Sequence, residues 1–197
     1  MWYPGGPERP VRKLPTVSPD FLHLTQSRTE IQLPEDLRAF MIAARKVTIA
    51  SENPPIQVPG RLGHNRFEYH ENGSPLYEVE FYDRPEVSSV FSGEEVIRTL
   101  GRDGQILVKY AFTGELTDSG LKIGKDIVGE KIRYFLREYA NLVRSGKTFE
   151  VEHMDGGNWI YTNISNPGKR MWHDAEFLNY RGTRLFTQIG TGSIFLP

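Results

Sequence analysis

The feature that most constrains the fold is a helical segment, Asp126 to Ser145, which stands between two stretches of similar β-rich sequence. Its apolar residues recur at steps of three and four, the spacing that gives a helix one buried face. These residues are Val128, Ile132, Phe135, Leu136, Tyr139, Leu142 and Val143. Gly146 stands where a left-handed residue often ends a helix, and Arg144 suits the negative end of the helix dipole. The pattern predicts a central helix with strands before and after it.

A first helix is predicted from Pro34 to about Thr48. Pro34 suits the first helical position, and Arg45 and Lys46 suit the last turn, where cations complement the helix dipole. The stripe expected to face the core is Leu33, Leu37, Phe40, Met41, Ala44 and Val47. Ser51 to Arg61 then carries several prolines and indicates a loop long enough to border a pocket, with a plain connector as the alternative.

After this loop the apolar period changes to two, which is typical of half-buried antiparallel strands. Leu76 to Tyr82 and Gln105 to Phe112 show the alternation most clearly. Asn72-Gly73 and Asp103-Gly104 are hairpin-turn dipeptides, because these residues tolerate the positive φ that tight hairpins need. The pattern predicts a meander of four or five strands.

Landmarks of this β-rich stretch return in the same order after the central helix. The four matched pairs are Phe67-Glu68 with Phe149-Glu150, Tyr77-Glu78-Val79 with Trp159-Ile160-Tyr161, Glu95-Val96-Ile97 with Glu176-Phe177-Leu178, and Ile106 to Gly114 with Leu185 to Gly192. The second copy has a shorter turn, at Arg181-Gly182. Because each copy also follows a helix, the order favours duplication over coincidence among ordinary hairpins.

The predicted fold class is α+β, with two helix-plus-antiparallel-sheet halves related by an approximate internal two-fold symmetry. The halves span about residues 33–118 and 119–196 of a single domain, residues 31–197. A Pro/Gly-rich arm, residues 1–30, precedes the domain, and its prolines exclude a regular helix or central strand. The arm is expected either to lie over a domain or partner surface or to fray.

Composition narrows the function classes. The 197 residues carry a net charge of -1 with dispersed basic residues, which disfavours nucleic acid and anionic membranes as partners. The sequence has no apolar run of membrane-spanning length and no signal-peptide pattern at its start, so we expect a soluble protein with no membrane partner. The absence of cysteine excludes disulfides and thiolate chemistry and fits a cytoplasmic location.

Two short motifs resemble an uncharacterised bacterial family, a domain of unknown function found alone or attached to helix-turn-helix regulators of the XRE type. The first is Phe91 to Val96 followed by Lys109 to Gly114, and the second runs from Tyr161 through Glu176 to Gly192. The resemblance covers about Leu33 to Leu196, although the stretch from Trp172 to Glu176 lacks an expected glycine. It implies no activity, and because we expect no DNA-binding helix pair within these residues, the association with regulators is not carried over.

Candidate catalytic groups are Glu95, Glu176 and His153. Paired carboxylates can divide acid and base roles when their environments separate their pKa values, and histidine titrates near neutrality. The structural alternatives are glutamates at strand edges or in turns, and a histidine that caps the edge of a core. No histidine spacing matches a zinc signature, so we expect neither a metal nor a cofactor. Gly190-Thr191-Gly192-Ser193 indicates a β-turn or bulge rather than a phosphate loop.

Candidate ligand-binding residues are Tyr77, Trp159, Tyr161 and Asn163. Aromatic strands suit an apolar pocket between the sheets, with Glu80, Glu95, Lys109, Asn163, Glu176 and Gln188 as polar candidates for its wall. A module that binds or senses a small, partly apolar ligand is therefore the first functional hypothesis. The alternatives are an isomerase, lyase or hydrolase with Glu/His acid–base chemistry, and an interaction protein that forms a homodimer through its arm or strand edges.

Overall fold

The fold was obtained as a computed structural model, which describes residues 34–70, 75–83, 89–99, 101–144, 147–168 and 170–195. The described helices are α2 (Glu35–Val47), α3 (Asp118–Ile123) and α4 (Lys125–Glu138). The described strands are β1 (Ile56–Gln57), β2 (His64–Tyr69), β3 (Leu76–Asp83), β4 (Val90–Arg98), β5 (Ile106–Leu116), β6 (Phe149–Met154), β7 (Asn158–Pro167), β8 (Met171–Tyr180) and β9 (Thr183–Ile194). The predicted N-terminal arm, the Asn72-Gly73 turn and Gly146 lie outside the described residues.

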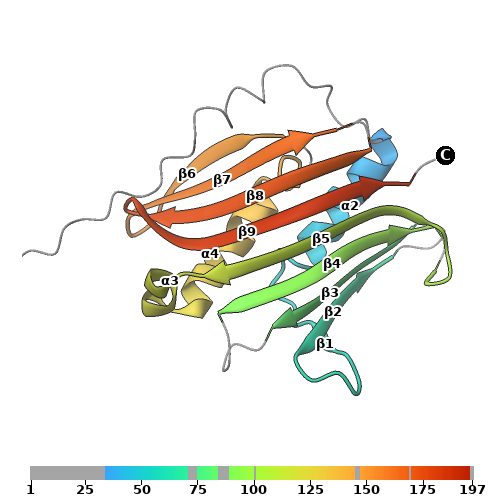
Figure 1. The fold of residues 1–197 in the computed structure, drawn as a ribbon, viewed down its shortest axis with the longest axis horizontal. Helices are drawn as coiled ribbons and strands as arrows, with labels where there is room; N and C mark the ends of the chain where they lie inside the picture. The colour runs from blue at the N-terminus through green and yellow to red at the C-terminus, as the bar shows by residue number, and fades with distance from the viewer. Residues whose placement is uncertain are drawn as a thin grey trace, which may run out of the picture.

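The strands form one antiparallel nine-stranded sheet in the order β1-β2-β3-β4-β5-β9-β8-β7-β6 (Figure 1). Strands β1 to β5 follow one another as a meander, as predicted, and β9 then pairs with β5, so that Phe112 lies opposite Gly190. The α+β class and the antiparallel sheet are confirmed. The expectation of a pocket between two sheets is wrong, because the β5–β9 pairing joins both halves into one continuous layer.

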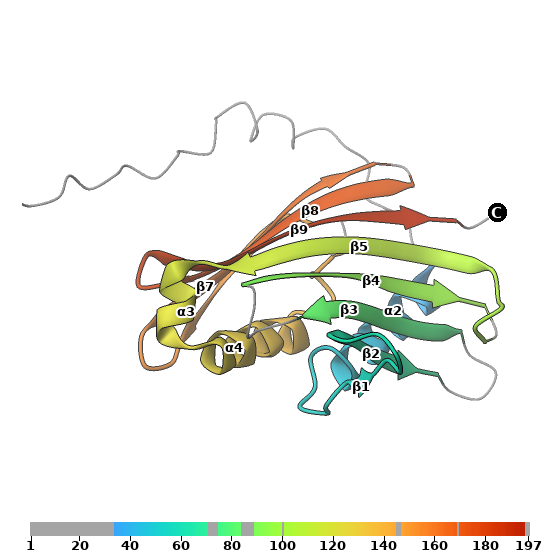
Figure 2. The ribbon, with the colours of Figure 1, turned by 60° about the horizontal axis from the view of Figure 1, so that its bottom comes forward.

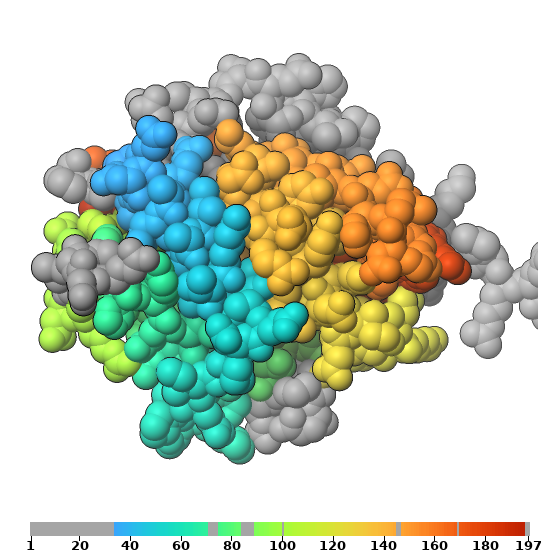
Figure 3. Space-filling model, turned by 180° about the vertical axis from the view of Figure 1, so that it is seen from behind, coloured from blue at the N-terminus to red at the C-terminus, as the bar shows by residue number. Residues whose placement is uncertain are grey.

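The two long helices, α2 and α4, lie on the same face of the curved sheet (Figure 2). We call the apolar cluster under the first helix the α2 core and the cluster under the second the α4 core. The α2 core contains Leu37, Met41, Ala44, Tyr77, Val79, Ile97, Val108, Tyr110, Trp172 and Ile194. The α4 core contains Ala50, Val128, Phe135, Leu136, Val143, Trp159, Tyr161, Leu178, Leu185 and Phe186. Seen from behind, the space-filling view shows α2 and the segment after it against α4 and its following turn (Figure 3).

The predicted stripe of α2 is confirmed at Leu37, Met41 and Ala44, which are buried. It is wrong at Val47, which is 47% exposed. The buried stripe instead includes Arg45, four residues after Met41, because this guanidinium finds a carboxylate partner in the sheet. Arg45 is therefore a core residue as well as a last-turn cation.

The central helix is shorter than predicted. Helix α4 ends at Glu138, and residues 139–144 continue as turns in which Leu142 and Val143 both donate to the carbonyl of Tyr139. Arg144 has a positive φ of 51° and is only 4% exposed. The left-handed backbone of Arg144 accompanies a side chain buried against the sheet, so its predicted role at the end of a helix is wrong.

The Gly190-Thr191-Gly192 segment lies inside strand β9, and the prediction of a turn or bulge there is wrong. A Cβ at Gly190 would stand 2.1 Å from the hydroxyl oxygen of Tyr110, and one at Gly192 would stand 2.0 Å from the Trp172 ring. The two rings lie 6.1 Å apart at their centroids, nearly parallel. The glycines are needed because two large aromatic side chains cross β9 at close range.

The sheet face opposite the helices is polar in the first half. Lys109 Nζ lies 2.8 Å from Glu94, and Arg66 Nε lies 2.9 Å from Glu68.

The β8–β9 turn is two residues long, Arg181-Gly182, as predicted. Each half contributes four strands that are consecutive in sequence and adjacent in the sheet, β2 to β5 in the first half and β6 to β9 in the second. The two-fold symmetry itself stays a prediction.

Candidate functional site

Four charged side chains meet between the two cores and on the helix-covered side of the sheet. They are Arg45 from α2, Glu95 from β4, Arg144 from the turn after α4, and Glu176 from β8, and all four are buried. We call them the charge quartet. Arg45 Nε donates to Glu95 at 2.6 Å, and Arg144 donates to Glu95 through Nη1 at 3.1 Å and to Glu176 through Nε at 2.9 Å.

Arg144 is the centre of the charge quartet because it bonds both carboxylates. The Nη1 group of Arg45 also donates to the backbone carbonyl of Val143 at 2.8 Å, which ties α2 to the turn that carries Arg144. The guanidinium of Arg144 lies over the rings of Tyr110 and Phe112, 5.0 and 5.1 Å from their centroids. Cation–π contacts of this kind add attraction where the cation has lost water. The charge quartet thus connects α2 and the turn after α4 to the sheet.

The carboxyl group of Glu95 is held in its charged form. Burial alone would raise the pKa of Glu95, but the charges of Arg45 and Arg144 and their hydrogen bonds outweigh burial and lower that pKa. The same pairing acts on the cation: burial would lower the pKa of Arg144, and Glu176, Tyr110 and Glu95 raise it well above its ordinary value. The quartet has no net charge.

Glu176 differs from Glu95 because neutral donors surround it. Tyr161 donates its hydroxyl at 2.6 Å, Gln188 donates its amide at 2.9 Å, and Tyr110 donates at 3.4 Å. The strand register supplies one of these donors, since Gln188 in β9 lies opposite Glu176 in β8. Burial raises the pKa of Tyr161 and of Tyr110 well above the ordinary value, and the nearby Glu176 charge adds to this shift. Both phenols are therefore neutral hydrogen-bond donors.

The structure joins two of the predicted catalytic residues and separates the third. Glu95 and Glu176 share Arg144, whereas His153 lies on the edge strand β6. The His153 ring stacks on Tyr134, with centroids 4.2 Å apart, and its Nε2 is 4.0 Å from the Asp155 carboxylate. This arrangement matches the structural alternative of a histidine at the edge of a core.

Three of the four predicted ligand-binding residues are in the cores. Tyr77 is fully buried in the α2 core, and Trp159 and Tyr161 are in the α4 core. Asn163 donates its amide to the carbonyl of Lys147 at 2.7 Å. Packing in the two cores explains the burial of the three aromatic rings without a ligand.

A buried carboxyl group stands near Asn163 without a cation. Asp174 is 4% exposed, and its nearest polar side chains are those of Ser165, Asn163 and Trp172, none of which is a cation. Burial raises the pKa of Asp174 to about 6, and the Glu176 charge adds to this shift, whereas hydrogen bonding from Ser165, Asn163 and Trp172 opposes it without cancelling it. The burial of Asp174 could not be predicted from the sequence, because a polar residue in a strand does not reveal which face of the sheet it occupies.

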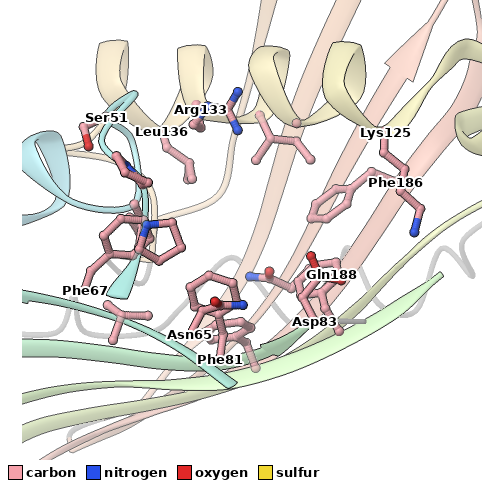
Figure 4. A pocket seen from close by; sticks show the side chains of 18 of the residues that line it. Ser51, Asn65, Phe67, Phe81, Asp83, Lys125, Arg133, Leu136, Phe186 and Gln188 are labelled. Carbon is pink, nitrogen blue, oxygen red and sulfur yellow. The ribbon is translucent and has the colours of Figure 1, made fainter. Parts of the chain in front are cut away.

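A cavity of about 620 Å³ opens beside the charge quartet, between the sheet, α4 and the segment that follows α2 (Figure 4). In Figure 4, Leu136 and Arg133 on α4 stand across the cavity from Asn65 and Phe81 on the sheet. Its apolar wall consists of Ile49, Pro54, Pro55, Phe67, Val79, Phe81, Phe91, Phe112, Leu116, Ile132, Leu136 and Phe186. Residues 51–55 form part of the lining, which confirms that the proline-containing loop borders a pocket.

Two buried polar side chains, Arg144 and Gln188, also contribute to the cavity wall. Gln188 is the one polar candidate from the sequence that does so. Glu95, Glu176, Trp159, Tyr161 and Asn163 are not part of this lining, contrary to the prediction. The carboxylates lie behind Arg144 and Gln188, which bond them.

The arginines were missed because each was assigned to a helix end. Arg45 follows Met41 by four residues and so continues the apolar stripe of α2, which was a usable signal. Arg144 gave no such signal, because its burial depends on the left-handed turn after α4.

Comparison of the chain with protein-family models, curated proteins and solved structures gives no match. The resemblance to the bacterial family of unknown function therefore stays a prediction. Within the described ranges, none of the helices is long and apolar enough to cross a membrane. The same residues contain no cluster of three or more histidine, aspartate or glutamate side chains suited to a metal ion.

Proposed function

We propose that the protein binds a small, largely apolar molecule in the cavity between the sheet and α4. The observation that carries this proposal is the wall itself: phenylalanines from strands far apart in the sequence surround a space of about 620 Å³. Small-molecule sites usually have volumes of about 300–1,000 Å³, apolar walls and a few placed polar groups. Arg144 and Gln188 are the buried polar groups of this site.

The acid–base enzyme has less support. A general acid or base has to reach the substrate, and neither Glu95 nor Glu176 lies on the cavity wall. The lowered pKa of Glu95 also suits a permanent counter-ion to arginine better than a group that exchanges protons near neutrality. We therefore favour binding or sensing over catalysis at this site.

The proposal is tested by plugging the cavity from α4. Gly129 contributes to the lining, and a Cβ there would meet only the Arg133 side chain, at 3.4 Å. Gly129→Leu should therefore fit the helix, gain helix propensity of roughly 0.5–1 kcal/mol and fill part of the cavity. The matched control is Glu130→Leu, which adds the same side chain at the exposed neighbouring position of the same helix.

The measurement is titration with N-phenyl-1-naphthylamine, an uncharged dye whose fluorescence rises in apolar surroundings. The wild type and Glu130→Leu should bind the dye saturably with equal affinity, and Gly129→Leu should bind it at least about tenfold more weakly, a loss of about 1.4 kcal/mol. Equal dye binding by all three folded proteins, or no saturable binding by the wild type, would contradict the proposal.

A further inference from the structure

We propose that the cavity selects uncharged ligands whose polar end both accepts and donates a hydrogen bond, such as a primary amide on an aromatic ring. This inference rests on the proposed binding function and adds the chemical class of the ligand. It follows from atoms of Gln188 and Arg144 that have no hydrogen-bond partner among the described residues, and from the charge balance of the quartet.

The orientation of the Gln188 amide is fixed by Glu176. An ionised carboxylate only accepts hydrogen bonds, so the amide nitrogen of Gln188 has to face it, at 2.9 Å. The carbonyl oxygen of Gln188 consequently points elsewhere. Among the described residues this oxygen accepts no hydrogen bond, and it is not one of the fully buried unpartnered atoms. Since Gln188 lines the cavity, its carbonyl is an acceptor available to a ligand.

Arg144 provides the matching donor. Its Nε and Nη1 groups bond Glu176 and Glu95, whereas Nη2 has no bond to the described residues and is not fully buried. Arg144 Nε and the Gln188 amide both bond the same Glu176 oxygen, Oε1, each at 2.9 Å. The two side chains are thus neighbours, and the wall presents an N–H donor beside a carbonyl acceptor.

The charge balance explains why the ligand should be neutral. The guanidinium of Arg144 is already matched by two carboxylates, and Arg45 balances the second of them. An incoming carboxylate would gain attraction to Arg144 but would stand close to Glu95 and Glu176. A cation would meet the same quartet with the signs reversed. In either case the charge loses hydration without a net opposite charge to replace it.

The rim of the cavity carries charges of both signs. Its acidic residues are Glu52, Asp83 and Asp126, and its basic residues are Lys125 and Arg133. A rim of mixed sign does not concentrate ligands of one charge, in contrast with a cleft lined by a single sign. The rim therefore adds no preference that would override the balance at the quartet.

The test compares three ligands of the same shape and different charge: 2-naphthamide, 2-naphthoate and 2-naphthamidine. Each is titrated against the wild-type protein at pH 7.5, and its dissociation constant is measured by displacement of N-phenyl-1-naphthylamine and by calorimetry. The amide should bind about tenfold or more tightly than either charged ligand. Tighter binding of the carboxylate or of the amidinium would overturn the inference while leaving the proposed binding function intact.

A comparison with naphthalene and with the variant Gln188→Leu then tests whether Gln188 causes the preference for the amide. In the wild type the amide should bind more tightly than naphthalene itself, because it can donate to Gln188 and accept from Arg144. Gln188→Leu should remove at least half of that advantage in free energy, and circular dichroism checks that the variant folds. An unchanged advantage in the folded variant would contradict the role of Gln188. If the variant does not fold, the three-ligand comparison on the wild type decides. Failure of naphthalene, the dye and all three ligands to bind would instead overturn the proposed function.

Discussion

Strands β4 and β8 each bury a glutamate on the same sheet face, and the two carboxylates are stabilised in different ways. Glu95 lies opposite Val79 and Tyr110, and its bonds come from two arginines. Glu176 lies opposite Asn163 and Gln188, and it accepts hydrogen bonds from one arginine and from neutral donors such as Gln188. The described residues of the neighbouring strands donate no hydrogen bond to the Glu95 carboxylate, and arginines from the helical layer donate to it instead.

The comparison separates two sources of stability. Glu95 depends on charge, so its contribution should follow the ionisation of its carboxyl group. Glu176 depends in part on hydroxyl and amide donors, which bond a neutral acceptor as well. Because Arg144 bonds both residues, its removal should affect both regions together.

The largest effect is expected for Arg144→Met. The change leaves Glu176 without a cation and Glu95 with Arg45 alone, although both carboxylates are buried. Removing one partner from a buried ion pair costs about 3–5 kcal/mol, and we expect a loss of about 4 kcal/mol in the free energy of unfolding. Urea denaturation at pH 7.5 measures it.

The matched control for Arg144→Met is Lys109→Met. Lys109 pairs with Glu94 at 2.8 Å on the opposite face, where the two side chains are 38% and 51% exposed. Exposed pairs contribute about 0–1 kcal/mol, so this variant should remain close to wild type. Equal losses for the two variants would show that the buried arginine has no special role.

The second prediction compares Glu95→Gln with Glu176→Gln. Glu95→Gln deprives Arg45 of its carboxylate and should cost about 3 kcal/mol at pH 7.5. Glu176→Gln leaves Arg144 bonded to Glu95 and keeps an acceptor for Tyr161, so we expect about 1–2 kcal/mol. The reverse order in urea denaturation would contradict the distinction between the two sites.

The pH dependence of Glu95→Gln sharpens this comparison. The folded protein lowers the pKa of Glu95 from its ordinary value of 4.5, so the charged form contributes stability above that value. The contribution is lost as the pH falls through the lowered pKa of the folded state. The cost of Glu95→Gln should therefore be constant between about pH 6 and 8 and shrink below about pH 4.

Much of the fold could be predicted from local patterns. The alternation in Leu76 to Tyr82 identified strand β3 and its buried side chains Tyr77 and Val79, because the period of side chains along a strand is two. The spacing in α4 identified Phe135 and Leu136 as core residues for the same kind of reason. The two halves are connected by the pairing of β5 with β9. This pairing brings together residues about 80 positions apart, so no local sequence pattern predicts it.

The site was predicted in part. Glu95 and Glu176 were chosen as a pair of candidate carboxylates, and the structure brings both of them to Arg144. Their partners were not predictable, since Arg144 reaches them only through a left-handed turn and Gln188 through the strand register. The sequence indicated which residues are unusual, but the contacts of those residues required the tertiary structure.

The third prediction concerns Asp174, the buried carboxyl group that has no arginine partner among the described residues and whose neutral neighbours, Ser165, Asn163 and Trp172, do not offset the effect of burial on its pKa. At pH 8 the folded protein has to hold this buried group charged, since burial raises the pKa from 3.8 to about 6. Asp174→Asn removes that charge and keeps the shape. We expect it to stabilise the protein at pH 8 by on the order of 2 kcal/mol, smaller than the losses predicted for Arg144 and Glu95.

The sign of the Asp174 effect distinguishes it from Glu95. A raised pKa means that the folded state takes up the proton first as the pH falls, so the wild type regains stability between about pH 6 and 4. Below about pH 4 the carboxyl group is protonated in both the folded and unfolded states, and the advantage of Asp174→Asn should disappear. Urea denaturation of both proteins from pH 8 to pH 4 measures this convergence, with Asp103→Asn, at an exposed turn, as the control. A destabilised Asp174→Asn at pH 8, or an advantage that does not change with pH, would mean that the Asp174 carboxylate is compensated in the folded protein.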